Sequence, residues 1–379
     1  MPTTEAQDKQ YIARTMELAA KAYGRTSPNP LVGAVIAKDG QVVGEGYHHR
    51  AGNKHAEILA LEEAGEAARG ATLYCNLEPC CTSGRTGACT EVIIPAGISR
   101  VVVSMRDPNP ENNQGLKRLE EAGIEITLGV GAVDATRLNA PYIKRVTRGL
   151  PYTIVKMAMS LDGKIATNTG DSMYITGEES RHKVHQLRNE ADAVMVGIGT
   201  VLADNPQLNV RIDTADLRHP QKIIVDSKAR VPTRCRTITK DPRTIVAVAA
   251  KASPTRLQAL REVGAHVEII EGSPVRVDVR ELMKRLSELG IVNLLIEGGG
   301  GLAASLFEAG LVDEVVTFVA PMIVGGAKAP GPVGGCGIRS LTEAHLLSEV
   351  TWEQIGSDMM VRGRVVNGDQ SLPGITISE

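Results

Sequence analysis

Aromatic side chains are scarce in this sequence. Phe, Trp and Tyr make up only 3% of its 379 residues, with a single tryptophan. Proteins that bind single-stranded nucleic acid stack bases on aromatic rings, and this chain has too few rings for such a surface. Lys and Arg number 42 against 44 Asp and Glu, so no excess of positive charge attracts nucleic acid or an anionic membrane. We therefore expect neither of them as a partner.

The sequence also lacks a long apolar run. No stretch approaches the roughly 20 apolar residues of a membrane-spanning helix, and the polar start, Met1 to Tyr11, is unlike a secretory signal. We expect a cytoplasmic protein. In a reducing compartment, clustered cysteines indicate metal binding or catalysis before disulfides. Four of the six cysteines form such a cluster: Cys75, Cys80, Cys81 and Cys89.

Chain length and the alternation of helical and strand patterns predict two α/β domains. In the first, we expect helices near 10–23, 54–68 and 90–96 and strands near 31–37, 42–47, 71–76 and 100–104. In the second, we expect strands near 152–159, 193–196, 222–225, 244–249, 292–297 and 314–319, with helices near 180–189, 253–263, 279–289 and 301–309. Basic and turn-forming residues between Tyr142 and Pro151 place the boundary, which gives domains of 1–147 and 148–379.

The strongest chemical signal is His55-Ala56-Glu57, followed by Pro79-Cys80 and then Cys89. An imidazole and two thiolates suit one zinc ion and leave its fourth tetrahedral position for water. Zinc lowers the pKa of bound water toward about 7, and Glu57 can pass a proton from that water to a leaving amine. Zinc-dependent nucleobase deaminases carry a signature of this form.

Two other interpretations of the motif stay open. A closed structural zinc site would take Cys75 or Cys81 as its fourth ligand, although Glu57 would then have no use. The motif alone also permits a nucleoside or nucleic-acid deaminase with an appended domain. The two cysteine ligands are nine positions apart rather than three, and the glycine-rich insertion carries Arg85, which is either a substrate phosphate ligand or a solvated side chain.

These residues resemble the bifunctional deaminase/reductase family of riboflavin biosynthesis over nearly the whole chain. The matching motifs are Ser27-Pro28-Asn29-Pro30, Gly46-Tyr47-His48, His55-Ala56-Glu57, Glu78-Pro79-Cys80, Ser160-Leu161-Asp162-Gly163-Lys164, Thr200 to Pro206 and Glu297-Gly298-Gly299. The resemblance implies a cytidine-deaminase-like three-layer domain followed by a dihydrofolate-reductase-like α/β domain. It also implies hydrolytic deamination of 2,5-diamino-6-(5-phosphoribosylamino)pyrimidin-4(3H)-one, and then NADPH-dependent reduction of the ribosyl group to ribityl.

For the first domain, the resemblance implies that His55, Cys80 and Cys89 bind zinc and that Glu57 is the catalytic proton shuttle. The implied substrate-binding positions are Asn29, His48, Thr82 and Arg85. Thr82 stands where the family typically has a histidine, and Gly87-Ala88 replaces the usual Pro-Pro. Deamination should survive these changes with weaker substrate binding, although a chain that retains only its reductase activity is an alternative.

In the second domain, the glycines from Gly298 to Gly301 lie between an expected strand and helix, where backbone amides suit a pyrophosphate. As a sequence feature alone, such a run of glycines forms a tight turn about as often as it binds a phosphate. The resemblance implies an NADPH site at Ala158, Tyr174, Thr200, Asp204, Ser227, Gly299, Gly300, Gly301, Leu302, Ala303, Ala304 and Ser305. It implies substrate contacts at Lys156, Ser172, Arg188, Leu208, Arg211 and Glu297. We expect a homo-oligomer, since symmetric assemblies are common among such enzymes.

Overall fold

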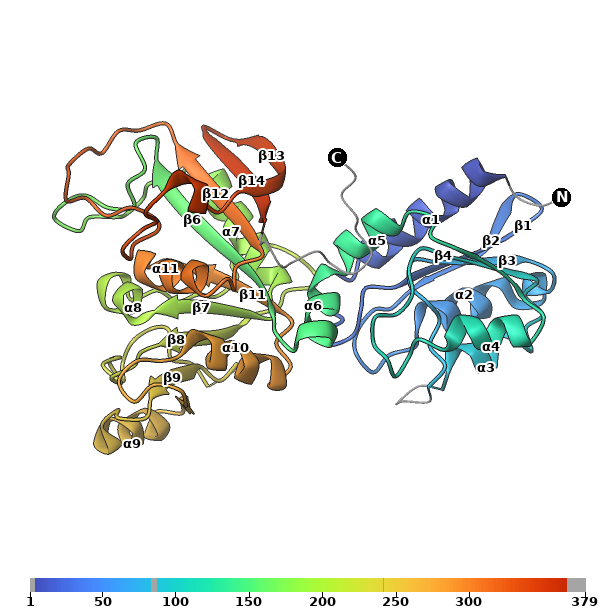
Figure 1. Cartoon of the computed structure of the whole chain (residues 1–379), viewed down its shortest axis with the longest axis horizontal. Helices are drawn as coiled ribbons and strands as arrows, with labels where there is room; N and C mark the ends of the chain where they lie inside the picture. Colours follow the sequence, from blue (N-terminus) through green and yellow to red (C-terminus); the bar gives the residue numbers. More distant parts are fainter. Residues whose placement is uncertain (1–3, 83–86, 241, 367–379) are drawn as a thin grey trace. The chain divides into compact units, whose positions relative to one another are not determined.

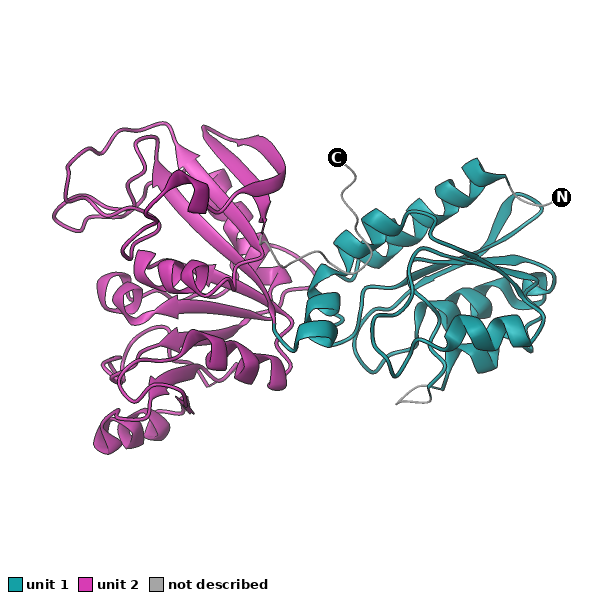
Figure 2. Ribbon diagram, viewed as in Figure 1, with its two compact units in different colours: residues 1–150 teal, residues 151–379 magenta. Residues whose placement is uncertain are grey.

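Two separate β-sheets organise the chain, one in each of its two compact units, residues 1–150 and 151–379 (Figure 2). The computed structural model describes residues 4–82, 87–240 and 242–366. The predicted substrate residue Arg85 lies outside these ranges. Within them, no helix has the length and hydropathy that crossing a bilayer requires.

Unit 1 (residues 1–150) contains a five-stranded sheet in the order β2-β1-β3-β4-β5. Its strands are β1 (Gly33–Lys38), β2 (Gln41–Tyr47), β3 (Thr72–Cys75), β4 (Arg100–Val103) and β5 (Glu125–Leu128). Strand β1 is antiparallel to β2 and β3, and β3, β4 and β5 are parallel. The helices are α1 (Glu5–Ala20), α2 (Ala56–Ala64), the short η1 (Gly65–Ala68), α3 (Cys89–Ile93), α4 (Gly115–Glu121), α5 (Ala132–Leu138) and α6 (Ala140–Arg148).

Helices cover both faces of this sheet, with α1 and α5 on one side and α2, α3 and α4 on the other (Figure 1). The strands alternate accordingly, since successive side chains point to opposite faces. Leu73 and Val101 pack against the side of α2, α3 and α4, whereas Tyr74 and Val102 pack against α1. The three-layer architecture expected for the first domain is confirmed.

Two glycines let α2 lie directly on β2. A Cβ atom on Gly44 would lie 2.3 Å from the carbonyl oxygen of Ala60, and one on Gly46 would lie 2.4 Å from that of Ala56. Any side chain at either position would therefore push the helix outward. This close approach fixes the N-terminus of α2, where two of the predicted active-site residues lie.

Unit 2 (residues 151–379) contains a nine-stranded sheet in the order β10-β9-β8-β7-β11-β6-β12-β14-β13. The strands are β6 (Tyr152–Ser160), β7 (Ala193–Gly197), β8 (Gln221–Val225), β9 (Ile245–Ala249), β10 (His266–Ile270), β11 (Asn293–Glu297), β12 (Glu314–Ala320), β13 (Leu347–Ile355) and β14 (Asp358–Val365). The helices are α7 (Glu178–Glu190), α8 (Ile198–Asp204), α9 (Pro254–Glu262), α10 (Val279–Glu288), α11 (Gly300–Glu308) and the short η2 (Leu341–Glu343). The sheet is parallel from β10 to β12 and antiparallel at β12-β14-β13, so the expected mostly parallel α/β domain is confirmed.

Every expected element has a counterpart, with shifted ends. The expectation of seven elements in the first domain was incomplete, because α4, β5, α5 and α6 follow β4. The stretch from Tyr142 to Pro151, in which the boundary was placed, is largely helix α6. Unit 2 also contains α8, β10, β13 and β14, which were not expected from the sequence.

Candidate functional site

Three predicted metal ligands meet in unit 1. The His55 Nδ1 atom lies 3.1 Å from the Cys89 Sγ and 3.4 Å from the Cys80 Sγ, and the two sulfur atoms are 3.4 Å apart. The pKa of the Cys80 thiol is lowered by hydrogen bonds from Cys89 and His55. The geometry thus brings one imidazole nitrogen and two sulfur atoms to a common point.

Each ligand is placed by the start or end of an element. His55 immediately precedes α2, Cys89 is the first residue of α3, and Cys80 lies on the loop that follows β3. The Cys89 backbone amide also donates a hydrogen bond to the Cys80 sulfur at 3.4 Å. The tight packing of α2 on β2 therefore fixes the position of His55 relative to the two cysteines.

Glu57 lies in the first turn of α2 and is only 3% exposed. Burial raises the pKa of its carboxyl group, and the Cys80 thiolate adds to that rise. Its Oε2 atom is buried without a hydrogen-bond partner among the described residues. A buried carboxyl with an unused oxygen beside the ligands suits a group that exchanges protons at the site.

The donor set fits zinc. The three ligand atoms all lie within 4.8 Å of one another, and two sulfur atoms with one imidazole nitrogen are ligands that zinc prefers. Three protein ligands leave one tetrahedral position for water or substrate, which is the arrangement of catalytic zinc sites. Cys75, offered above as a fourth structural ligand, is fully buried on β3, and burial raises the pKa of its thiol well above the usual value.

Glu78 fixes the loop between β3 and α3 that carries Cys80, a role that was not predicted from the sequence. Its buried carboxylate accepts hydrogen bonds from the Asp107 amide at 3.1 Å and the Leu116 amide at 2.9 Å. The adjacent Pro79 carbonyl lies so close to α4 that a Cβ atom on Gly115 would be 1.9 Å from its oxygen. The start of α4 and the residue before Cys80 are therefore packed backbone to backbone.

The predicted pyrimidine ligands Asn29 and His48 also meet. The Asn29 Nδ2 atom lies 3.0 Å from the His48 Nε2, and the His48 Nδ1 lies 3.1 Å from the Lys54 carbonyl oxygen. The Nδ1–H therefore donates to Lys54, and Nε2 accepts from Asn29. Burial lowers the pKa of His48, which favours this neutral form. Its ring packs edge-on against that of His55 at 5.5 Å between centroids, which places the pair beside the metal ligands.

Thr82 does not point freely toward a substrate. Its hydroxyl donates a hydrogen bond to the Asn112 Oδ1 at 2.6 Å, and the Arg118 guanidinium donates to the Cys81 carbonyl at 3.1 Å. The residues just after Cys80 are thus tied to the segment that leads into α4. The predicted role of Arg85 falls on residues that the structure does not describe.

In unit 2, three predicted substrate residues form a charged cluster. Glu297 ends β11 and pairs in register with Lys156 of β6, and it binds Arg188 of α7 through both oxygens at 2.5 and 2.7 Å. Burial would raise the pKa of Glu297, but Arg188 and Lys156 outweigh it and lower the value. Burial lowers the pKa of Lys156. The cluster thus holds two basic groups and one carboxylate, and basic groups of this kind can bind a phosphate.

Arg211 is held by a residue that sequence reasoning missed. The Arg211 backbone amide donates to the His185 Nδ1 at 3.2 Å, and its side chain donates to the Gln207 Oε1 at 3.1 Å. His185 lies on α7, one turn before Arg188, so helix α7 supports both Arg188 and Arg211, two of the predicted substrate contacts. Leu208 is buried next to Gln207 with a positive φ of 52°.

The predicted nucleotide residues gather where parallel strands end. Gly299 follows β11 and precedes α11, and a Cβ atom on Gly299 would lie 3.2 Å from the Thr200 hydroxyl, which follows β7. Ala158 lies two residues beyond Lys156 on β6, which neighbours β11. Such strand ends are the usual ligand site of parallel α/β sheets.

The remaining predicted residues have the following contacts. Ser172 donates to the Asp204 Oδ1 at 3.3 Å, and the Arg181 guanidinium lies 4.6 Å from the centre of the Tyr174 ring. Ser227 follows β8, and its hydroxyl accepts a hydrogen bond from the Val277 amide. The residues from Gly300 to Ser305 form the first turns of α11.

Two family models match the chain, one in each unit. Residues 5–105 match the cytidine and deoxycytidylate deaminase zinc-binding region, and residues 151–361 match the RibD C-terminal domain. Each match covers one of the two sites described above.

Full-length relatives and solved structures agree with both matches. The riboflavin biosynthesis protein RibD of Aquifex aeolicus is 41% identical over 93% of this chain and 97% of its own, and that of Escherichia coli is 39% identical over 93% and 98%. Acinetobacter baumannii RibD superimposes with a TM-score of 0.87 at 34% identity, over 96% of this chain and 100% of that structure. A diaminohydroxyphosphoribosylaminopyrimidine deaminase/5-amino-6-(5-phosphoribosylamino)uracil reductase from Thermotoga maritima gives 0.83 at 34% identity, over 96% and 99%.

Proposed function

Because this chain belongs to the RibD family of riboflavin biosynthesis proteins, we propose that it catalyses two consecutive reactions, one in each unit. Unit 1 hydrolyses an amino group from 2,5-diamino-6-(5-phosphoribosylamino)pyrimidin-4(3H)-one. Unit 2 then reduces the ribosyl group of the product to ribityl with NADPH. The observation that carries the first assignment is the convergence of His55, Cys80 and Cys89 beside the buried carboxyl of Glu57.

In the deaminase site, His55, Cys80 and Cys89 would hold zinc, whose chemistry is that of a Lewis acid that makes water a nucleophile near neutral pH. Glu57 takes a proton from the attacking water and delivers it to the departing amine. Asn29 and His48 orient the pyrimidine, with the amide and the neutral imidazole fixed by their own hydrogen bond. Because the Thr82 hydroxyl is bonded to Asn112, position 82 contributes less to substrate binding than a free side chain would.

In the reductase site, NADPH supplies the hydride, and the protein aligns the cofactor with the sugar carbon. The amides at the start of α11 face the pyrophosphate, with Thr200 and Asp204 at the neighbouring loop. Ala158, Tyr174 and Ser227 complete our proposed cofactor site. Lys156, Arg188 and Arg211 attract the substrate phosphate, and Glu297 keeps Arg188 in place.

Ammonia release from the diaminopyrimidine by the zinc-loaded protein tests this function, with NADPH first withheld and then added. We expect ammonia without NADPH and NADPH oxidation only after deamination. NADPH consumption with the deaminated substrate but no ammonia would leave a reductase alone. Ammonia from cytidine or single-stranded DNA in place of the pyrimidine phosphate would favour the nucleoside or nucleic-acid alternative.

We also propose a homo-oligomer in the cytoplasm, as the sequence predicts. Light scattering on the purified protein measures the oligomeric state, and a mass equal to the 40.3 kDa monomer would contradict this part of the proposal.

A further inference from the structure

A glycine-rich segment between β12 and β13 has no role in the function proposed above. We call residues 322–337 the strap. The strap contains Gly325, Gly326, Gly331, Gly334, Gly335 and Gly337. Glycine has no side chain to pack and has a flexible backbone, so the strap needs contacts with other residues to keep one conformation.

Asp162 anchors the first part of the strap. Its two carboxylate oxygens accept hydrogen bonds from the Val324 amide at 3.0 Å and from the Gly325 amide at 2.7 Å. The Ser160 hydroxyl donates to the same carboxylate at 2.6 Å. These three bonds lower the pKa of Asp162 to about 2, so the carboxylate is charged whenever the enzyme works.

The turn that carries Asp162 makes three more contacts with the strap. The Leu161 amide donates to the Met322 carbonyl at 2.9 Å. The Lys164 Nζ donates to the Ala329 carbonyl at 3.1 Å, and the Ile165 amide donates to the Pro330 carbonyl at 3.0 Å. This turn directly follows β6, the strand that contributes Lys156 to the substrate cluster. The strap is therefore tied to a rigid strand of the sheet.

The second part of the strap lies on the first turn of α11. The Gly334 amide donates to the Gly300 carbonyl at 2.9 Å. A Cβ atom on Gly300 would lie 3.0 Å from both the Gly331 oxygen and the Gly334 nitrogen. The two backbones can contact each other because both Gly300 and Gly334 lack a side chain. The first intrahelical bond of α11 runs from the Leu302 amide to Gly299, so the strap contact lies at the turn where the cofactor phosphates are expected.

We propose that Asp162 is a positioning residue for NADPH: it anchors the strap so that the strap holds the Gly299–Gly301 turn in its cofactor-binding conformation. This inference rests on the proposed reductase function. Without the anchor, the strap and the turn must be ordered when NADPH binds, and that entropic cost weakens binding. The hydride transfer itself uses none of these residues, so its rate should not change.

Two substitutions at Asp162 test the anchor. Asp162→Ala removes both acceptors, and Asp162→Asn keeps one. Asp162 is exposed, so water competes for these bonds and their loss changes an equilibrium by several-fold rather than more. We expect the KM and the Kd of NADPH to rise several-fold for Asp162→Ala and less for Asp162→Asn, with kcat and the KM of the deaminated substrate unchanged. NADPH fluorescence titration gives the Kd, and initial rates give the kinetic constants.

A matched pair of substitutions tests the contact between the strap and α11. A Cβ atom on Gly334 would lie 3.2 to 3.4 Å from the Gly300 and Gly301 backbone, whereas one on Gly331 has its nearest neighbour, the Gly163 oxygen, at 3.6 Å. Neither glycine has a positive φ. Gly334→Ala should therefore raise the Kd of NADPH several-fold, and Gly331→Ala should leave it unchanged.

The deaminase activity of each full-length variant reports on folding of the same polypeptide. The proposal is overturned if folded Asp162→Ala and Gly334→Ala bind NADPH as tightly as the original protein. It is also overturned if they bind it more tightly, which would mean that the strap obstructs the site. Failure of the original protein to bind NADPH would instead refute the proposed reductase function.

Discussion

At the scale of single residues, Glu57 is the side chain on which the first reaction depends most. Glu57→Gln keeps the size of the side chain and removes its ability to accept a proton. We expect the rate of ammonia release to fall by about 10²- to 10⁴-fold. Reduction of the deaminated substrate should not change, because it occurs in the other unit. Zinc content by elemental analysis is the control, and a variant that keeps its zinc and its deaminase rate would remove Glu57 from the mechanism.

His185 is a second residue with a measurable effect. Burial, together with the charges of Arg188 and Arg211, lowers the pKa of His185 to about 4, so the ring is neutral at pH 7 and its Nδ1 accepts from the Arg211 amide. His185→Leu removes the acceptor, and we expect the KM of the phosphorylated reductase substrate to rise by up to about tenfold with little change in kcat. His185→Asn places an oxygen near the Nδ1 position and should restore most of the affinity. Equal effects of the two substitutions would indicate a packing role only.

Residue types and spacing were enough to predict which side chains would meet in the metal site. His55, Cys80 and Cys89 form a motif whose chemistry depends on few other residues, and the structure brings their ligand atoms together. The supporting contacts could not be predicted in this way. His185 and Arg211 are far apart in the sequence and meet only because α7 packs beside the loop after α8. Thr82 was predicted to bind substrate, but its bond to Asn112 depends on the packing of another segment.

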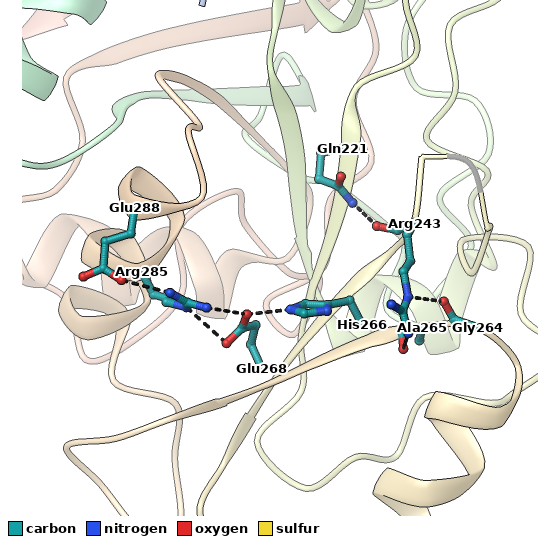
Figure 3. Close-up of polar contacts among 8 residues, drawn as sticks. All are labelled: Gln221, Arg243, Gly264, Ala265, His266, Glu268, Arg285 and Glu288. Carbon is teal, nitrogen blue, oxygen red and sulfur yellow. Dashed lines mark hydrogen bonds and ion pairs between the residues drawn. The ribbon is translucent and has the colours of Figure 1, made fainter. Parts of the chain in front are cut away.

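At the scale of elements, the edge strand β10 is held by a cluster of side chains (Figure 3). Glu268 lies 2.6 Å from the His266 Nε2 and binds Arg285 of α10 at 3.2 and 3.3 Å. An edge strand has only one hydrogen-bonded neighbour, so such side-chain contacts contribute more to its position. Glu268→Gln should lower the free energy of unfolding of unit 2 by up to about 1 kcal/mol at pH 7. Glu288→Gln, which removes only an exposed partner of Arg285, is the matched control and should have almost no effect.

The loss of unfolding free energy in Glu268→Gln should become smaller as the pH falls. Burial would raise the pKa of Glu268, but Arg285 and His266 outweigh it and lower the value. A carboxylate whose pKa is lower in the folded state stabilises the protein above its unfolded pKa, about 4.3, and this stability is lost as the pH falls through the folded value. The difference between Glu268→Gln and the original protein should therefore be present at pH 7 and shrink as the pH falls below about 4.3 toward the lower pKa of the folded state. Trp352, the single tryptophan, lies on β13, so its fluorescence follows the unfolding of unit 2. A difference that is as large at pH 3 as at pH 7 would contradict the ion-pair interpretation.

Hydrophobic periodicity predicted many of the elements and missed others, some of which have buried apolar side chains. Helix α1 begins before its apolar stripe, at the capping box of Thr4 and Gln7, a signal that the sequence contains. Helix α6 was not predicted, although Pro141 near its start and Gly149 at its end are typical helix signals. Strands β13 and β14 were missed because β13 is largely exposed and its residues show no clear alternation.

At the scale of the whole molecule, each unit has a sheet, a core and a site of its own. All three metal ligands, Glu57 and the Asn29–His48 pair belong to residues 1–150, and the described residues predicted to bind NADPH belong to residues 151–379. The sequence predicted this separation from two independent sets of motifs. It follows that one reaction can be removed while the other is kept.

Removal of zinc should make that separation visible. A chelator that strips the protein should abolish ammonia release, because the three ligands of unit 1 then have no metal to hold. NADPH oxidation with the deaminated substrate should continue at its original rate, and unfolding followed by Trp352 fluorescence should not shift, since both belong to unit 2. Added zinc should restore deamination, and magnesium should not, because thiolate ligands disfavour it. Loss of both reactions together, or deamination by protein shown by elemental analysis to be free of metal, would contradict the assignment of zinc to the deaminase site alone.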